Sequence, residues 1–445
     1  MSFNIPPLPK SVVLLGLGRS GIASALWLLE RGINVIAWDN NQETREKAAS
    51  RGIPLKDLME FSWETEKIDA LVLSPGIPHT FPKPHPVAQK AKDLQIPIIG
   101  DMELFVRGNP KAHLICITGT NGKSTTTSLI GHMLQEAKIP CRIGGNIGIC
   151  VLDLAPIPED GFYVIECSSF QLELTPSLHP EIALLLNITP DHLDRHNNLQ
   201  GYVAAKKLIF NHVKNTAIIG SDDTETATIL KDLQSRKSLN VIANVIPDQI
   251  LNFSSYPALQ GSHNKQNAAA AYHVAKTLGI DQKIVEKAFQ SFPGLPHRQE
   301  VICVHDGIRY VNDSKATSVV AASQALATYK NILWIAGGRG KEESLNTLSP
   351  YFPNILHAYL IGEATDSFAK DLEGKIPFTK VQTLDKALLE AHSTALSSGT
   401  KNPTILLSPA CTAFDQFKDF EARGDAFKRQ VHELLKIEKR TSHVS

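Results

Sequence analysis

Short apolar runs alternate with amphipathic stretches along most of the chain. The runs are four or five residues long and end in glycine or polar residues; examples are residues 12–15, 70–73, 162–165, 183–186 and 332–336. Buried parallel strands have such continuous apolar runs, whereas surface helices repeat their apolar residues about every 3.6 positions. The pattern therefore predicts an α/β fold with parallel-rich sheets and helices between the strands.

Two breaks in this pattern divide the chain. One falls near Gly100-Asp101, and the other follows Phe292-Pro-Gly-Leu-Pro296, where the composition changes. A chain of 445 residues is too long for one compact core and predicts about three domains of ordinary size. We expect three α/β domains, at 1–101, 102–295 and 296–445.

Charge and composition narrow the class of protein. The chain has 45 basic and 45 acidic side chains, so its bulk charge indicates neither nucleic acid nor an anionic membrane as a partner. No apolar run approaches the length of a membrane-spanning helix, and the first residues lack the pattern of a secretory signal. The six cysteines are scattered without metal-site spacing, which favours reduced thiols. We expect a cytoplasmic monomer with no membrane span.

A glycine-rich turn stands between the apolar run at 113–117 and an amphipathic stretch. It reads Gly119-Thr-Asn-Gly-Lys-Ser-Thr125. In a strand–turn–helix context such a turn cradles phosphate: Lys123 reaches the terminal phosphates and the Ser124 hydroxyl binds Mg²⁺. The general pattern would need its first glycine at Ile117, so this is a shorter form. The alternative is an ordinary turn that contains Gly-Lys-Ser.

Polar residues follow the central apolar runs. Glu166 ends one run, and Asp191 and His192 follow another. Parallel strands end at one edge of a sheet, so we expect these side chains near the glycine-rich turn, where an acid binds Mg²⁺ or orients water. The alternatives are a helix-capping or surface acid for Glu166 and a backbone-bonded imidazole for His192.

Two helical segments carry further candidates. The residues at helical spacing around Lys206 are apolar or aromatic, so Lys206 is predicted on the packed face, either snorkelling or functional, whereas Lys207 is predicted in solvent. Asn264 and Asn267 are three residues apart and suit the edge of a nucleobase. The alternative for Asn264 is a helix cap.

A second glycine-rich turn lies near the start of the chain. Gly16-Leu-Gly18-Arg-Ser-Gly21 follows an apolar run and opens a helix, and Asp39 ends the next strand. This turn predicts a Rossmann-like domain that holds a diphosphate, with the acid placed for a ribose or sugar hydroxyl. Ser74 follows a third strand at the same edge. Alone, the turn would indicate a dinucleotide-dependent oxidoreductase.

The last third repeats the alternation of strands and helices, which predicts a second Rossmann-like domain. Three polar clusters follow its strands, at 312–317, 337–341 and 408–415. Arg298 stands at its entrance, where its guanidinium suits a phosphate or carboxylate; the alternative is a surface ion pair.

Together these motifs resemble the Mur ligases of peptidoglycan synthesis over nearly the whole chain, and within them the branch that adds D-glutamate. The resemblance rests on eight ordered motifs: Gly119-Thr-Asn-Gly-Lys-Ser-Thr125, Gly144-Gly-Asn-Ile-Gly148, Glu166-Cys-Ser-Ser-Phe-Gln-Leu-Glu173, Thr189-Pro-Asp-His-Leu-Asp-Arg195, His263-Asn264, Leu295-Pro-His-Arg298, Asn312-Asp-Ser-Lys-Ala-Thr317 and Leu407-Ser-Pro-Ala-Cys411.

The resemblance implies a reaction. ATP converts the carboxylate of UDP-N-acetylmuramoyl-L-alanine to an acyl phosphate, and the amine of D-glutamate attacks it. The domains would bind, in order, the UDP-sugar, ATP and the amino acid, and two Mg²⁺ ions would take part. Catalysis and metal binding would involve Lys123, Ser124, Glu166, His192 and Lys206, the last as its carbamate.

The resemblance also implies binding residues for each substrate. ATP would contact Gly119, Thr120, Asn121, Gly122, Lys123, Ser124, Thr125, Asn264, Asn267, Arg298, Asp313 and Lys315. The UDP-sugar would contact Gly18, Arg19, Ser20, Asp39, Ser74, Asn146 and Ser168. D-Glutamate would contact Thr317, Lys341, Thr412 and Phe420.

Two positions depart from the family pattern. Ala413 replaces a common serine, so Thr412 or backbone amides would hold the amino-acid carboxylate, and Asn40-Asn41 stands where a basic residue is common. The alternatives are another Mur-type or a folylpolyglutamate-type ligase, a dinucleotide-dependent oxidoreductase, and a P-loop binding protein without chemistry. The glycine-rich turn near the start argues against folylpolyglutamate synthases, which resemble only the later domains.

Overall fold

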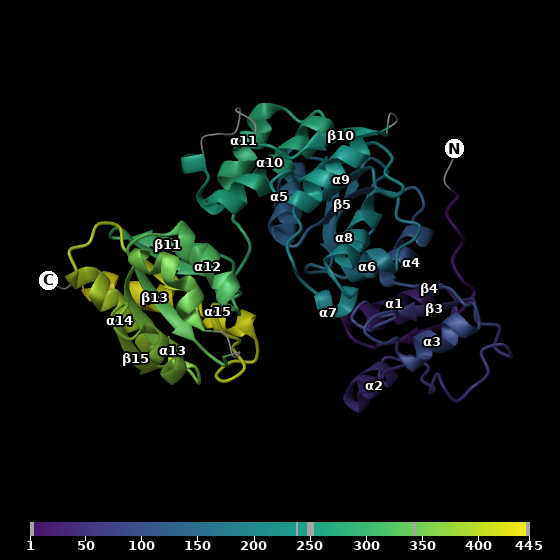
Figure 1. Cartoon of the computed structure of the whole chain (residues 1–445), viewed down its shortest axis with the longest axis horizontal. Helices are drawn as coiled ribbons and strands as arrows, with labels where there is room; N and C mark the ends of the chain where they lie inside the picture. The colour runs from purple at the N-terminus through teal and green to yellow at the C-terminus, as the bar shows by residue number, and fades with distance from the viewer. Residues whose placement is uncertain (1–3, 237–238, 247–252, 341–343, 442–445) are drawn as a thin grey trace. The chain divides into compact units, whose positions relative to one another are not determined.

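A computed structural model describes residues 4–236, 239–246, 253–340 and 344–441 (Figure 1). The chain divides into two compact units, one at 1–251 and 263–289 and the other at 252–262 and 290–445. The first unit contains two sheets and the second contains one. The predicted class, a three-domain α/β fold with parallel-rich sheets, is confirmed, while the domain boundaries stay a prediction.

The first sheet is parallel, with strand order β2-β1-β3-β4. Alternate residues of β1 belong to two apolar clusters: Val12 and Leu14 to one, Val13 and Leu15 to the other. The sheet is therefore buried on both faces, which is why its strands have continuous apolar runs. Its strands are β1 (Ser11–Leu15), β2 (Asn34–Trp38), β3 (Ala70–Leu73) and β4 (Ile98–Ile99), and its helices are α1 (Arg19–Leu29), α2 (Gln42–Ala49), α3 (Pro86–Asp93) and α4 (Asp101–Gly108).

The central sheet is also parallel, with order β10-β9-β8-β5-β7-β6. The phosphate-loop strand β5 lies between β7 and β8, so both strands end beside the loop. The strands are β5 (His113–Thr118), β6 (Cys141–Gly145), β7 (Phe162–Glu166), β8 (Ile182–Leu185), β9 (Thr216–Ile219) and β10 (Asn240–Ala243). The helices are α5 (Lys123–Glu136), α6 (Ser169–Glu173), α7 (Leu193–His196), α8 (Leu199–Lys207), α9 (Thr224–Gln234), α10 (Ser262–Thr277) and α11 (Gln282–Ser291), with 3-10 turns η1 (Val151–Asp153) and η2 (Leu208–Phe210).

The second unit has a sheet of order β11-β12-β16-β13-β14-β15, in which only the β11–β12 pair is antiparallel. Trp334 and Ala336 pack in one apolar cluster and Leu333 and Ile335 in another, so this sheet too is covered on both faces. Its strands are β11 (Glu300–His305), β12 (Ile308–Asn312), β13 (Ile332–Gly337), β14 (Ile355–Ile361), β15 (Phe378–Gln382) and β16 (Thr404–Leu407). Its helical segments are η4 (Phe253–Ser255), η5 (Pro257–Leu259), α12 (Val319–Thr328), η6 (Leu345–Asn354), α13 (Thr365–Leu372), α14 (Leu384–Ser397) and α15 (Phe420–Thr441).

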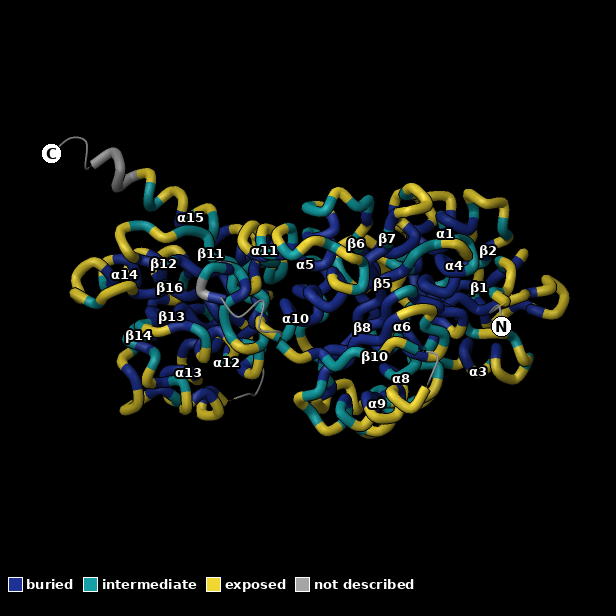
Figure 2. The backbone as a smooth tube through the Cα atoms, turned by 90° about the horizontal axis from the view of Figure 1, so that it is seen from above, coloured by how far each residue is buried: buried dark blue, intermediate teal, exposed yellow. Residues whose placement is uncertain are grey.

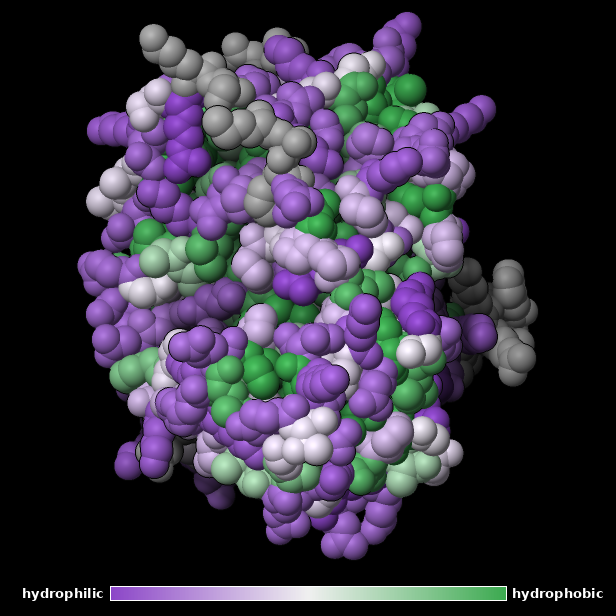
Figure 3. Space-filling model, turned by 90° about the vertical axis from the view of Figure 1, so that its right-hand side faces the viewer, coloured by the Kyte–Doolittle hydropathy of each residue, from purple (hydrophilic) through white to green (hydrophobic). Residues whose placement is uncertain are grey.

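Buried backbone runs through the centre of each sheet and exposed backbone through the loops (Figure 2). On the face shown in Figure 3, apolar surface occurs in small groups among hydrophilic side chains. Among the described residues, no helix is both long enough and apolar enough to cross a membrane.

Candidate functional site

The glycine-rich turn at 119–122 joins β5 to α5, as its sequence predicts. Gly119 and Gly122 have φ angles of +155° and +84°, which side chains rarely adopt. A Cβ atom on Gly122 would stand 2.2 Å from the side-chain oxygen of Asn267. The two glycines are therefore required by the path of the backbone and by the close approach of α10.

The segment after β8 holds this phosphate loop in place. The backbone N–H of Thr120 donates to the Asn187 carbonyl at 2.9 Å, and that of Asn121 donates to the Asn187 side-chain oxygen at 2.8 Å. The Thr189 N–H donates to the Thr120 hydroxyl oxygen at 3.0 Å. These bonds tie the loop to the residues that precede His192.

Two lysines donate to the same carbonyl of the phosphate loop. Lys123 Nζ lies 3.0 Å from the Gly119 oxygen, and Lys206 Nζ lies 2.8 Å from it. Lys206 is only 1% exposed; its burial and the nearby charge of Lys123 lower its pKa to about 7. Lys207 instead forms an exposed ion pair with Asp232. The predicted division between a packed Lys206 and a solvated Lys207 is confirmed.

Glu166 ends β7 beside β5, where Ile117 is its register partner. The Asn146 side chain donates to Glu166 Oε1 at 2.9 Å, while Oε2 is buried without a hydrogen-bond partner among the described residues. A buried carboxylate oxygen without a donor is costly unless a cation or water approaches it. The site therefore fits Mg²⁺, whose preferred ligands are oxygens. Asn146, predicted as a substrate contact, also orients this acid.

His192 lies at the surface of the same region. Its side chain is 50% exposed, and Nε2 lies 3.6 Å from Asp191 Oδ2. Tyr202, which sequence reasoning did not select, connects the two predicted ligands: its ring lies 6.3 Å from the His192 ring and 4.5 Å from Lys206 Nζ. Within the described ranges, no three His, Cys, Asp or Glu side chains form a metal cluster.

Asn264 and Asn267 are buried in the first two turns of α10. The Asn267 amide donates to Asn264 Oδ1 at 3.1 Å, and its oxygen accepts from the Thr126 hydroxyl at 3.2 Å. Asn264 lies inside the helix, not at its cap. The pair therefore joins α10 to the phosphate-loop helix.

In the N-terminal turn, the Asp39 carboxylate accepts from the backbone N–H of Leu17 at 2.7 Å and of Asn41 at 2.8 Å. It thus fixes the turn that precedes Gly18 and Arg19. The Ser20 and Ser74 hydroxyls lie 3.4 Å apart, which brings two predicted substrate residues together.

Ser168 has a local structural role. Its hydroxyl oxygen accepts from the Gln171 N–H, and its own N–H donates to the Gln171 side chain, a reciprocal cap at the start of α6. This helix begins three residues after Glu166, so the cap helps to define the end of β7.

In the second unit, Asp313 is buried after β12. It accepts from the Gln299 N–H at 3.1 Å and the Ser408 hydroxyl at 2.8 Å. Its burial raises its pKa to about 7, against the opposing effect of its bonds to Ser408 and Gln299 and of the Arg298 charge. Arg298 therefore influences Asp313, as their neighbouring motifs suggest.

Of the residues predicted to bind the amino acid, Thr317 and Thr412 lie in loops that follow β12 and β16, and Phe420 begins α15. Lys315 Nζ lies 5.2 Å from the Phe420 ring centre. The Thr317 N–H donates to the Lys315 carbonyl, and the Thr412 hydroxyl donates to the Arg339 carbonyl. Lys341 lies outside the described residues. Ala413 is buried. Its methyl side chain offers no polar group to a ligand.

Sequence reasoning missed Arg423. Its side chain is 1% exposed and donates to the Ser314 hydroxyl at 2.9 Å and to the carbonyls of Cys411 and Thr412 at 3.0 and 3.2 Å. It thus joins the loops after β12 and β16. The available signal was its spacing of four residues from Phe427, which places both side chains on one face of α15. Arginine is rarely buried on such a face without a structural reason.

Comparison with known proteins agrees with this geometry. The Mur ligase middle domain matches residues 117–248, and the Mur ligase MurD-like N-terminal domain matches 10–100. The chain is 43% identical to the UDP-N-acetylmuramoylalanine--D-glutamate ligase of Paramagnetospirillum magneticum, covering 95% of this chain and 96% of that protein. It is 43% identical to the ligase of the same name from Rhodospirillum rubrum, covering 95% and 94%.

Solved structures share the fold at lower identity. UDP-N-acetylmuramate-alanine ligase MurC from Thermotoga maritima has a TM-score of 0.54 at 17% identity, covering 96% of this chain and 100% of that one. MurF from Acinetobacter baumannii has a TM-score of 0.53 at 20% identity, covering 74% and 79%. The family expected from the ordered motifs is confirmed: the chain belongs to the Mur ligases.

Proposed function

We propose that this Mur ligase joins D-glutamate to UDP-N-acetylmuramoyl-L-alanine at the expense of ATP, in the synthesis of peptidoglycan precursors. The observation that carries the proposal is the 43% identity, over 95% of the chain, to a ligase of that name. The MurD-like N-terminal domain at 10–100 supports it against a folylpolyglutamate-type ligase, and the phosphate loop supports it against an oxidoreductase.

The reaction must activate a carboxylate, which is a poor electrophile. A carboxylate oxygen of the UDP-sugar attacks the terminal phosphorus of ATP, ADP leaves, and an acyl phosphate forms. The amine of D-glutamate then attacks the acyl carbon, phosphate leaves, and the amine loses a proton as the amide forms. Lys123, at the start of α5, would stabilise the negative charge on the transferred phosphoryl group.

Bound Mg²⁺ would supply charge neutralisation for the phosphates. Glu166 and Ser124 would hold one ion, and the unpartnered Oε2 of Glu166 supports this assignment. His192 and Lys206 would hold a second ion, with Lys206 as its carbamate.

Carbamate formation requires a neutral amine that attacks carbon dioxide and releases a proton. The pKa of Lys206, about 7, leaves much of the amine neutral at physiological pH. The lysine environment is therefore suited to this modification.

The binding roles are proposed residue by residue. The loop at 119–125, Asn264 and Asn267 would contact ATP in the first unit, and Arg298, Asp313 and Lys315 in the second. Gly18, Arg19, Ser20, Asp39, Ser74, Asn146 and Ser168 would contact the UDP-sugar. Thr317, Lys341, Thr412 and Phe420 would contact D-glutamate. Because ATP and a nucleotide sugar are the substrates, we expect the enzyme in the cytoplasm. We also expect a monomer.

Phosphate release measures the proposed reaction directly. We expect release only when ATP, Mg²⁺, UDP-N-acetylmuramoyl-L-alanine and D-glutamate are all present, and much less with L-glutamate, glycine or diaminopimelate. Release without an amino acid would contradict the ligase reaction. A faster reaction with another amino acid would retain a Mur ligase but replace the substrate.

A further inference from the structure

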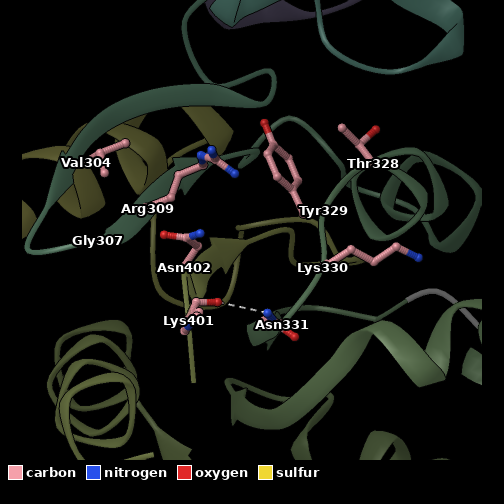
Figure 4. Close-up of a pocket in the computed structure, with 9 residues that line it drawn as sticks. All are labelled: Val304, Gly307, Arg309, Thr328, Tyr329, Lys330, Asn331, Lys401 and Asn402. Carbon is pink, nitrogen blue, oxygen red and sulfur yellow. Dashed lines mark hydrogen bonds between the residues drawn. The ribbon is translucent and has the colours of Figure 1, made fainter. Parts of the chain in front are cut away.

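A cavity of about 350 Å³ lies in the second unit, at the edge of the sheet where β12, β13 and β16 begin (Figure 4). Asp313, Lys315, Thr317 and Thr412, which are proposed to bind ATP or D-glutamate, follow the opposite ends of β12 and β16. The strands run parallel and are four to six residues long, which separates the two edges by roughly 13–20 Å. The cavity is therefore distinct from the proposed active site.

The lining of the cavity is basic. Arg309, Lys330 and Lys401 are three of its nine lining residues, and none of the nine is acidic. The guanidinium of Arg309 is directed toward the Tyr329 ring, at 5.9 Å from the ring centre, with the Asn402 side chain nearby (Figure 4). Lys330 points outward and donates to Asn354. Arg309 and Lys401 are therefore the cations available to a ligand.

Hydrogen bonds to backbone carbonyls connect the segments that carry these basic residues. The Asn331 side chain donates to the Lys401 carbonyl at 3.0 Å, and the Thr404 N–H donates to the Asn331 carbonyl at 3.0 Å. The Arg309 N–H donates to the Pro403 carbonyl at 3.0 Å. The site thus exists before a ligand binds, which reduces the entropy that binding costs.

We propose that this cavity binds a small phosphorylated anion. A guanidinium presents paired donors that match phosphate oxygens, a lysine adds charge, and the Asn402 amide adds neutral donors. The volume is at the lower end of the range for small-molecule sites. This inference is independent of the proposed ligase activity.

Calorimetric titration of the full chain with pyrophosphate, in buffer without Mg²⁺, tests the site. We expect two classes of binding event, the first at the glycine-rich turns at 16–21 and 119–125 and the second in this cavity. Lys123→Ala should weaken the first and keep the second. Lys401→Gln and Arg309→Gln should each weaken the second at least tenfold and keep the first, and Lys401→Gln changes an exposed side chain, so it leaves the fold intact.

The matched control is Lys370→Gln, an exposed lysine of α13 in the same unit, which should keep both classes of event. The inference is overturned if wild-type protein shows only the first class, if Lys401→Gln binds pyrophosphate like wild type, or if Lys370→Gln loses as much affinity. Titration with citrate separates phosphate from carboxylate chemistry. Binding of citrate as tight as that of pyrophosphate would overturn the preference for a phosphorylated ligand.

Discussion

Lys206 and Lys123 donate to one acceptor, the carbonyl oxygen of Gly119, at 2.8 and 3.0 Å. Two ammonium groups that share an oxygen repel each other, and Lys206 is also removed from water. Both effects favour the neutral amine of Lys206. The neutral amine, which is the nucleophilic form of lysine, therefore lies next to the phosphate loop. It is carried by α8, which is distant from the loop in sequence.

Replacement of this lysine tests its chemical role. Lys206→Ala should lower kcat at least about a hundredfold, as expected for loss of a group that organises charge at a phosphoryl-transfer centre. Lys207→Ala, which removes an exposed partner of Asp232, should stay within about twofold of wild type. Added acetate or formate should restore part of the activity of Lys206→Ala, because a small carboxylate replaces a carbamate. Wild-type activity in Lys206→Ala would mean that the lysine has only a structural role.

The pKa of Lys206 also predicts how stability depends on pH. Its folded value of about 7 lies below the ordinary value of 10.5, so between these values the unfolded chain binds a proton that the folded chain does not. Stability therefore rises with pH across this window, and the full cost of a buried ammonium is present below it.

Lys206→Met removes this cost. The variant should melt roughly 3–8 °C above wild type at pH 6.5, and the difference should shrink toward pH 9.5. Scanning calorimetry in buffer free of carbon dioxide makes the measurement, since carbamate formation would otherwise change the group. Lys207→Met should show no such trend. A constant difference between Lys206→Met and wild type would mean that the amine titrates at its ordinary pKa.

Glu166 provides a second test, through the metal. Glu166→Gln keeps the size of the side chain but removes the charge, so the Mg²⁺ concentration for half-maximal activity should rise at least about tenfold. Asn146→Ala removes the donor to Oε1 and should raise this Mg²⁺ concentration about threefold to tenfold. Glu181→Gln, at a partly exposed acid before β8, is the control. An unchanged Mg²⁺ dependence in Glu166→Gln would assign this acid a structural role.

The strands and turns of the active region followed from local pattern, because buried parallel strands and glycine-rich turns have short-range signatures. The phosphate loop, the strand that ends at Glu166 and the packed face of Lys206 were all predicted in this way. The central strands β6, β9 and β10 and the antiparallel partner β11 were not identified from the sequence, because their positions depend on contacts with distant segments.

Some side-chain roles could not be predicted from local sequence patterns, for the same reason. Asn146 approaches Glu166, and Arg423 reaches Ser314, only through the tertiary fold. Spacing likewise placed Asn264 beside Asn267, but it did not show that Asn267 accepts a hydrogen bond from Thr126 of α5. The number of metal ions and the binding of each substrate stay predictions, since they depend on groups that come together around a ligand.

Asp313 predicts the opposite pH trend to Lys206. Its folded pKa of about 7 lies above the ordinary value of 3.8, so the folded chain keeps a proton that the unfolded chain releases. Stability is lost as pH rises through this window. Asp313→Asn should therefore gain melting temperature relative to wild type between pH 5 and pH 7.5, by several degrees. Asp306→Asn, at an exposed acid, should show no gain, and an equal trend in both variants would exclude Asp313 as the cause.

Gly21 and Gly18 separate the structural from the binding role of the N-terminal turn. A Cβ atom on Gly21 would stand 1.8 Å from the Gly16 carbonyl oxygen, whereas one on Gly18 would meet nothing within 4 Å. Gly21→Ala must push α1 away from the turn and should destabilise the protein by at least about 3 kcal/mol. Gly18→Ala fits its backbone, with φ of −65°, and should keep the melting temperature.

If the turn holds the diphosphate of the UDP-sugar, the new methyl group of Gly18→Ala occupies space that the phosphates need. KM for the UDP-sugar should then rise about tenfold, while KM for ATP, which binds at another loop, should not change. Equal KM values in Gly18→Ala and wild type would mean that the sugar nucleotide binds elsewhere. A rise in both KM values with a lower melting temperature would instead indicate a general loss of structure, which the open space around Gly18 does not predict.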